Sequence, residues 1–141
     1  MPANIYHQAI KQLAADEIGA GLLPAANAAA TMDNPLCGDR VSLQLILEKN
    51  QIKQVAHQVR GCLLCKAAAS IIGTAAEGCS EQEIHQVHDQ LAAMLQGDSS
   101  VNWRPNWTSL SHFEPVQSQK SRHGCVLLPF KTLLRAMAKT E

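Results

Sequence analysis

The residues of this sequence with the most distinctive chemistry are its five cysteines. Cys37 lies in the segment NPLCGD, where Pro35 stiffens the chain and Gly38 permits the positive φ of a tight turn. A turn of this kind can aim the sulfur of Cys37 and the carboxylate of Asp39 at one point. The segment therefore predicts either a metal-binding turn or an ordinary turn with a buried thiol, and the spacing alone leaves both open.

Two further cysteines stand where a helix is expected to begin. Cys62 follows Gly61, and Cys125 follows Arg122, His123 and Gly124. The positive end of a helix favours the thiolate, which is the form of cysteine that binds metals and attacks sulfur. Cys62 and Cys125 are therefore candidate metal ligands or reactive thiolates.

The remaining two cysteines have weaker patterns around them. Cys65 forms a CxxC pair with Cys62, but a zinc ribbon needs a second such pair, which the sequence lacks. Cys65 is either a small core residue in an alanine-rich helix or an additional ligand. Cys79 has no converging polar residues in its segment, and we interpret it as structural.

The six histidines contribute less to the prediction. His85 and His88 are three residues apart on an expected helix and could bind a metal, but their acidic neighbours favour a solvated face. His57 is expected to be exposed or half-buried in a strand. His123 is the histidine nearest a candidate site, two residues before Cys125.

Composition excludes several classes of function. Lys and Arg together number 12, as do Asp and Glu, so the formal charge is zero and no basic face for nucleic acid is expected. No apolar stretch reaches the roughly 18–20 residues of a membrane span, and the first residues lack the pattern of a signal peptide. We expect a cytoplasmic protein with reduced cysteines and with neither nucleic acid nor membrane as a partner.

Periodicity predicts one α+β domain over residues 1–141, with a small antiparallel sheet packed against a helical layer. Helices are expected at 3–15, 62–76, 80–95 and 126–137, the third opened by a capping box and the last with Pro129 in its first turn. Alternating residues at 40–48 and 52–59 predict a hairpin. Residues 18–39 read as a long loop with at most a short extended piece, and 98–121 as polar and irregular.

Three segments resemble a known family when they are taken together. NPLCGDRVSLQL, VRGCLLCKAAASII and SRHGCVLLPFKTLL are similar in order and spacing to segments of the U-type iron–sulfur cluster scaffolds, which include IscU, SufU and the N-terminal domain of NifU. The resemblance extends from about Tyr6 to Met137. A glycine rather than a histidine before Cys125, together with the long segment between 92 and 116, favours a divergent SufU-like member.

The resemblance implies a ligand set and a function. It implies that Cys37, Asp39, Cys62 and Cys125 lie together at one end of the fold and hold Zn²⁺ or a [2Fe–2S] cluster. Arg122 matches a basic residue of the family, whereas Cys65 and His123 depart from its pattern; all three are candidate accessory residues. The resemblance further implies that the protein is an assembly scaffold or sulfur acceptor and not a self-contained enzyme. Such a protein can also act as an accessory in sulfur transfer. The implied partners are a cysteine desulfurase of the SufS or IscS kind and apo iron–sulfur recipient proteins.

Among these residues Cys37 is the expected sulfur acceptor, because its glycine-flanked loop can move toward a partner. Two alternatives stay open. The first is a zinc-stabilised protein-interaction domain without sulfur chemistry. The second is a hydrolase that uses Cys125 and His123, and it is disfavoured because no segment suggests an oxyanion hole.

Overall fold

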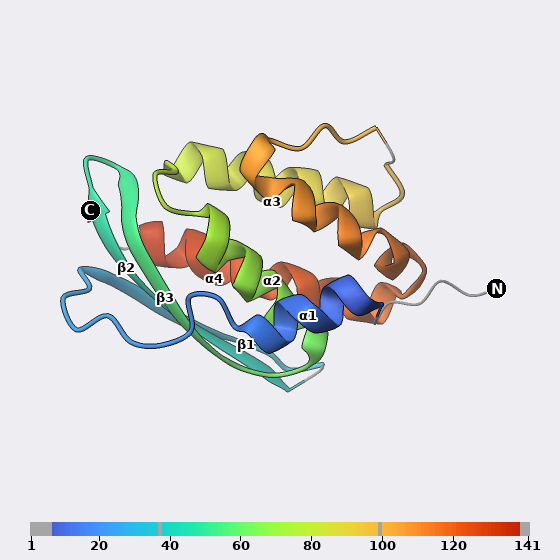
Figure 1. The fold of residues 1–141 in the computed structure, drawn as a ribbon, viewed down its shortest axis with the longest axis horizontal. Helices are drawn as coiled ribbons and strands as arrows, with labels where there is room; N and C mark the ends of the chain where they lie inside the picture. The colour runs from blue at the N-terminus through green and yellow to red at the C-terminus, as the bar shows by residue number, and fades with distance from the viewer. Residues whose placement is uncertain (1–6, 37, 99, 139–141) are drawn as a thin grey trace.

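The computed structural model describes residues 7–36, 38–98 and 100–138. Figure 1 shows a curved sheet with helices stacked on one of its faces. In chain order the elements are α1 (Gln8–Asp16), β1 (Ala28–Asn34), β2 (Asp39–Glu48), β3 (Gln51–Arg60), α2 (Leu63–Ala75), α3 (Glu81–Leu95), the 3₁₀ helices η1 (Pro105–Ser118) and η2 (Lys120–Arg122), and α4 (His123–Ala138).

The sheet has the order β1-β2-β3, and both pairs of neighbouring strands are antiparallel. The predicted hairpin is β2 and β3, joined through Lys49 and Asn50, both of which have positive φ. Two consecutive residues of this kind match the twist of a tight hairpin. Val41, Leu43 and Leu45 are fully buried on one face, as their alternation in the sequence predicts.

The strand β1 corrects the prediction of a long loop at 18–39. It pairs with β2 along its whole length, from Ala28 opposite Leu45 to Asn34 opposite Asp39. Alanine has a low strand propensity, so the run of alanines gives little sign of a strand. Ala28 and Ala30 are nevertheless buried, and small side chains here let α4 pack closely on the strand.

Two helices cover the inner face of the sheet. The helix α4 packs on β1 and β2, and α2 packs on β3 and along α4. The helices α3 and η1 form an outer layer over α4 and α2, and α1 lies against α2 (Figure 1). This α+β arrangement is the predicted one, and within the described residues no helix is long and apolar enough to cross a membrane.

The segment predicted to be irregular is largely a 3₁₀ helix. Within η1 the residues Trp107, Leu110, Phe113 and Val116 are buried and stand three residues apart. A 3₁₀ helix has three residues per turn, so this spacing places all of them on one face. The ring of Trp107 packs against Phe130 of α4 with a centroid distance of 5.9 Å.

Two helix beginnings test the sequence interpretation. The capping box of α3 is present: Ser80 Oγ accepts from the Glu83 amide at 3.2 Å, and Glu83 Oε1 accepts from the Ser80 amide at 3.1 Å. The helix α4 begins at His123, earlier than predicted, so Pro129 lies in its second turn. Proline has no amide hydrogen and cannot donate to the carbonyl of Cys125 four residues before it.

The turn after α1 is fixed by side chains from α2 and β3. Ser70 Oγ accepts from the Ile18 amide at 2.9 Å, and His57 Nε2 donates to the Ile18 carbonyl at 2.7 Å. A Cβ at Gly73 would overlap the Ile18 carbonyl, so glycine is needed for this close approach. His57 is only 2% exposed, which corrects the expectation of an exposed or half-buried residue.

Burial of His57 makes the stability of the fold depend on pH. Desolvation lowers the pKa of His57 below its ordinary value of 6.5, and the Ile18 hydrogen bond and the charge of Glu17 offset this only in part. Below about pH 6.5 the unfolded chain therefore binds a proton that the folded chain does not, and the free energy of unfolding decreases as the pH falls. We expect His57→Phe to flatten this dependence, as measured by urea unfolding between pH 7.5 and 5.5. Parallel pH profiles for the variant and the wild type would contradict the expectation.

Candidate metal centre

One end of the molecule brings together three segments that are far apart in the sequence. Asp39 is the first residue of β2, Cys62 precedes the first residue of α2, and Cys125 lies in the first turn of α4. Their ligand atoms all lie within 4.8 Å of one another. The structure thus gathers three of the four residues that the sequence predicts as ligands.

The fourth predicted ligand, Cys37, lies outside the described residues. Its neighbours show how the chain turns at this point. The Gly38 amide donates to the Asn34 carbonyl at 2.8 Å, and Gly38 has the positive φ of 73° that the sequence suggests. The side chain of Leu36, just before Cys37, is 88% exposed.

The carboxylate of Asp39 is buried, with 1% exposure, and is held by Cys62. Its Oδ1 accepts from the Cys62 amide at 3.0 Å, while Oδ2 lies 3.9 Å from Cys62 Sγ. One oxygen thus fixes the carboxylate, and the other lies beside the sulfur. This division of roles leaves Oδ2 available as a ligand.

The donor set fits a metal ion. Thiolate, thiolate and carboxylate are ligands of four-coordinate zinc, with bonds of about 2.0–2.3 Å that place the ligand atoms roughly 3.3–3.8 Å apart. The distance from Cys62 Sγ to Asp39 Oδ2, 3.9 Å, is close to this value. Two ligand atoms at the 4.8 Å limit of the group would have to approach each other by about 1 Å. Small side-chain rotations would suffice.

The beginnings of helices α2 and α4 provide an electrostatic field that favours anions. Cys62 caps α2 without a side-chain hydrogen bond to the helix, and Cys125 lies in the first turn of α4. Amides at the beginning of a helix carry partial positive charge and stabilise anions. Two thiolates and a carboxylate can therefore be brought together here at lower electrostatic cost than elsewhere in the fold.

Each of these two cysteines follows a glycine that makes room for a side chain from the β1–β2 hairpin. A Cβ at Gly61 would overlap the carboxylate of Asp39, lying 2.8 Å from its Cγ. A Cβ at Gly124 would lie 3.0 Å from Asn34 Nδ2. The glycines were noticed in the sequence only as residues that precede helices, and their spatial role appears in the structure.

Of the three predicted accessory residues, His123 turns one ring nitrogen away from the group. His123 Nε2 lies 3.0 Å from the Val116 carbonyl and 3.2 Å from the Gln117 carbonyl, so this nitrogen donates toward η1 and is not a ligand. Cys65 is fully buried in the hydrophobic core. Arg122 is half-buried at the end of η2.

The helix α3 holds no comparable group. His85 is exposed near Glu81 as predicted, whereas His88 is half-buried with Nδ1 3.0 Å from Asp89. Among the described residues, the one group of side chains placed so that they could hold a metal ion is that of Asp39, Cys62 and Cys125.

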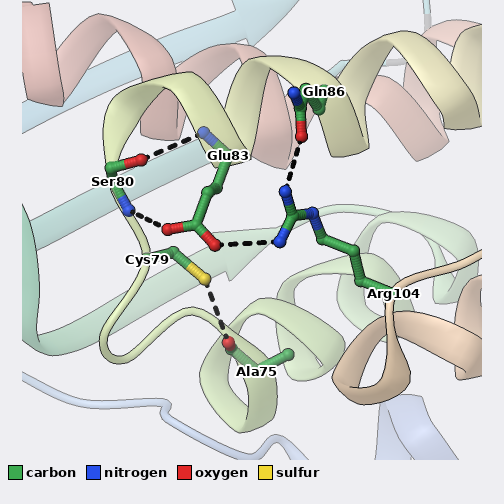
Figure 2. A network of polar contacts seen from close by, with 6 residues as sticks. All are labelled: Ala75, Cys79, Ser80, Glu83, Gln86 and Arg104. Atoms are coloured by element: carbon green, nitrogen blue, oxygen red, sulfur yellow. Dashed lines mark hydrogen bonds and ion pairs between the residues drawn. The ribbon is translucent and has the colours of Figure 1, made fainter.

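Cys79 belongs to a structural network at the beginning of α3. Figure 2 shows its sulfur donating to the Ala75 carbonyl, at 3.6 Å, beside the capping box of Ser80 and Glu83. Burial raises the pKa of the Cys79 thiol, and the negative charge of Glu83 adds to this effect. Glu83 also pairs with Arg104 at 3.1 Å. Burial and the charge of Glu83 outweigh the opposing charge of Arg104 and favour the protonated thiol, which supports the structural interpretation of Cys79.

Comparison with known proteins agrees with this geometry. The profile of the NifU-like N terminal domain matches residues 5–102, which is more than half of the chain. The chain belongs to the NifU-like N-terminal domain family. The match ends before Cys125, whose place beside Asp39 and Cys62 is seen in the structure.

Two relatives of this NifU-like chain align over most of its length. It is 26% identical over 113 residues to the zinc-dependent sulfurtransferase SufU of Bacillus subtilis (strain 168), covering 78% of this chain and 74% of that protein. It is also 26% identical over 136 residues to the iron–sulfur cluster assembly scaffold protein IscU of Thermotoga maritima, covering 96% and 94%.

Solved structures show the same fold. The N-terminal part of a NifU-like protein from Brucella abortus superposes with a TM-score of 0.90 at 26% identity, covering 96% of this chain and 94% of that one. A SUF-system scaffold protein from Fervidobacterium islandicum, described as putative in its own name, gives a TM-score of 0.84 at 25% identity, covering 94% and 96%. The fold and the family expected from the sequence are therefore confirmed.

Proposed function

We propose that this protein is an iron–sulfur cluster assembly scaffold or sulfur acceptor whose metal centre consists of Cys37, Asp39, Cys62 and Cys125. The observation that supports the proposal most strongly is the convergence of the last three within 4.8 Å at the beginnings of two helices. We include Cys37 because it stands two residues before Asp39 in the sequence. The names of the relatives, a zinc-dependent sulfurtransferase and a cluster scaffold, point in the same direction.

In the resting protein Zn²⁺ would be held by the three thiolates and by Oδ2 of Asp39. The ion would keep the thiolates deprotonated and apart. A carboxylate is a harder ligand than a thiolate and binds a soft metal less tightly. Asp39 would therefore be the ligand of the set that dissociates from the metal most readily. A [2Fe–2S] cluster is then the cargo of the same residues, which assemble it and release it to an apo-protein.

Sulfur would arrive from a cysteine desulfurase as a persulfide. The thiolate of Cys37 attacks the terminal sulfur, a new S–S bond forms on Cys37, and the S–S bond of the donor breaks to release its thiolate. No external oxidant or reductant is needed. The exposure of the neighbouring residue Leu36 supports this role for Cys37. The protein then acts in the cytoplasm, where thiols stay reduced, and depends on its partner for catalysis.

Anaerobic incubation with a cysteine desulfurase, cysteine, ferrous iron and a dithiol reductant, which supplies the electrons that convert persulfide sulfur to sulfide, tests the proposal. We expect a visible cluster chromophore and, without iron and reductant, one added sulfur atom on the protein. Trypsin separates the candidate acceptors, because the peptide that ends at Arg40 contains Cys37 alone and the one that begins at His123 contains Cys125 alone. Mass spectrometry of the peptides identifies the acceptor.

Two variants make this experiment specific. Cys37→Ser should lose the added sulfur, while Cys79→Ser, which changes a cysteine outside the centre, should retain it. Zinc binding without chromophore or persulfide would overturn the proposal and favour a zinc-stabilised interaction domain.

A further inference from the structure

The last pair of residues in the β1–β2 ladder is Asn34 opposite Asp39. Each of the two reaches a cysteine that follows a glycine at the beginning of a helix. Asp39 contacts Cys62, while Asn34 Nδ2 lies 4.0 Å from the sulfur of Cys125. The two halves of the centre are thus built in the same way, one with a carboxylate and the other with a carboxamide.

We infer that Asn34 is a positioning residue for Cys125, and that its Nδ2–H donates to the Cys125 sulfur when this sulfur serves as a metal ligand. The inference rests on the proposed function and goes beyond it, because it assigns a role to a residue outside the ligand set.

The orientation of the Asn34 amide follows from its other contact. Oδ1 accepts from the Leu36 amide at 3.1 Å, and this requirement directs Nδ2, the donor, toward Cys125. Asn34 therefore does two things at once: it closes the turn that leads to Cys37, and it presents N–H to the sulfur on α4.

The close approach of Asn34 to Gly124 also supports this role for Asn34. Any side chain at position 124 would press on Asn34 Nδ2, from which a Cβ would be only 3.0 Å away. The beginning of α4 is thus shaped to admit the amide. An N–H donor withdraws electron density from a thiolate and fixes its direction, and such supporting groups typically change metal affinity 10–100-fold.

The test compares two substitutions of Asn34 in the full-length protein. Asn34→Asp keeps an oxygen that accepts from the Leu36 amide but replaces the donor near the sulfur with an acceptor. Asn34→Ala removes both. We expect each variant to bind Zn²⁺ about 10–100-fold more weakly, as measured by competition with a chromogenic chelator. We also expect a shifted thiolate-to-metal charge-transfer band in the Co²⁺-loaded protein.

A purely structural role predicts another pattern. If Asn34 only closed the turn, Asn34→Asp would match the wild type in affinity and in the Co²⁺ band, and that result would overturn the inference. The control is Asp33→Asn, which removes an exposed ion pair with Arg40 at the same end of the hairpin and should change neither readout.

Gly124→Ala provides a second test that leaves the amide in place. Its Cβ should displace Asn34 and weaken Zn²⁺ binding several-fold. Combined with Asn34→Ala, the same substitution should cause no further loss, since the crowded amide is gone. Fully additive losses would contradict the inference. A wild-type protein that binds no metal would overturn the proposed function as well, whereas wild-type binding with unaffected variants overturns this inference alone.

Discussion

Replacing Asp39 with alanine should lower Zn²⁺ affinity by more than about 100-fold, because losing a group that merely supports a ligand already costs 10–100-fold. The substitution removes a buried oxygen that lies 3.9 Å from Cys62 Sγ and the acceptor of the Cys62 amide. Asp39→Asn should fall between alanine and the wild type, since its neutral oxygen can still accept from that amide but is a poorer ligand. Zinc content after anaerobic purification and chelator competition measure the effect.

The metal-free state provides the control for Asp39. A buried carboxylate near two other potential anions is costly without a cation. Asp39→Asn should therefore leave the unfolding temperature of the metal-free protein unchanged or higher, while the zinc-loaded protein loses stability. Equal zinc content in the wild type and Asp39→Ala would show that Asp39 is not a ligand.

Adding a single methyl group at Gly61 should disrupt the centre without replacing any of the proposed ligands. In Gly61→Ala the new Cβ overlaps the Asp39 carboxylate, so the carboxylate or the beginning of α2 has to move. We expect Zn²⁺ affinity to fall nearly as far as in Asp39→Ala, with a loss of about 1–3 kcal/mol in the free energy of unfolding of the metal-free protein. Urea unfolding and chelator competition measure the two effects separately.

A double variant distinguishes the overlap with Asp39 from any other effect of the substitution at Gly61. Combining Gly61→Ala with Asp39→Ala removes the carboxylate that the methyl group meets. The double variant should recover the lost stability but not the zinc affinity. If its stability stayed as low as that of Gly61→Ala, strain elsewhere in the strand-to-helix junction would be the cause.

The sequence predicts the elements whose burial follows a simple period. The alternation in β2 and the capping box of Ser80 and Glu83 both appear in the structure as expected. The strand β1 was missed because its inward residues are alanines, which are selected by the closeness of α4 and not by strand propensity. The helix η1 was missed because its period is three, and a search limited to periods of 2 and 3.6 passes over it.

The candidate centre was predictable only as a set of residue types. Helix beginnings and the joint resemblance indicated Asp39, Cys62 and Cys125, and the structure brings them together. Sequence proximity was misleading for His123, whose ring turns to the carbonyls of η1. Asn34 gave no signal of its own, because an asparagine before a proline is ordinary in a turn. Its role depends on a contact across 91 positions of the chain.

The candidate centre also lies where three structural units meet: the beginning of the central strand β2 and the beginnings of two helices. A cargo bound here acts as a temporary crosslink between segments that are otherwise joined only by packing and weak polar contacts. Binding of the cargo should slow the hydrogen exchange of backbone amides in the first turns of α2 and α4 and just before β2. Release of the cargo should restore the faster exchange. If the proposed function holds, the rigidity of this end of the molecule would differ between the loaded and the unloaded protein, and a partner that binds here would meet two different surfaces.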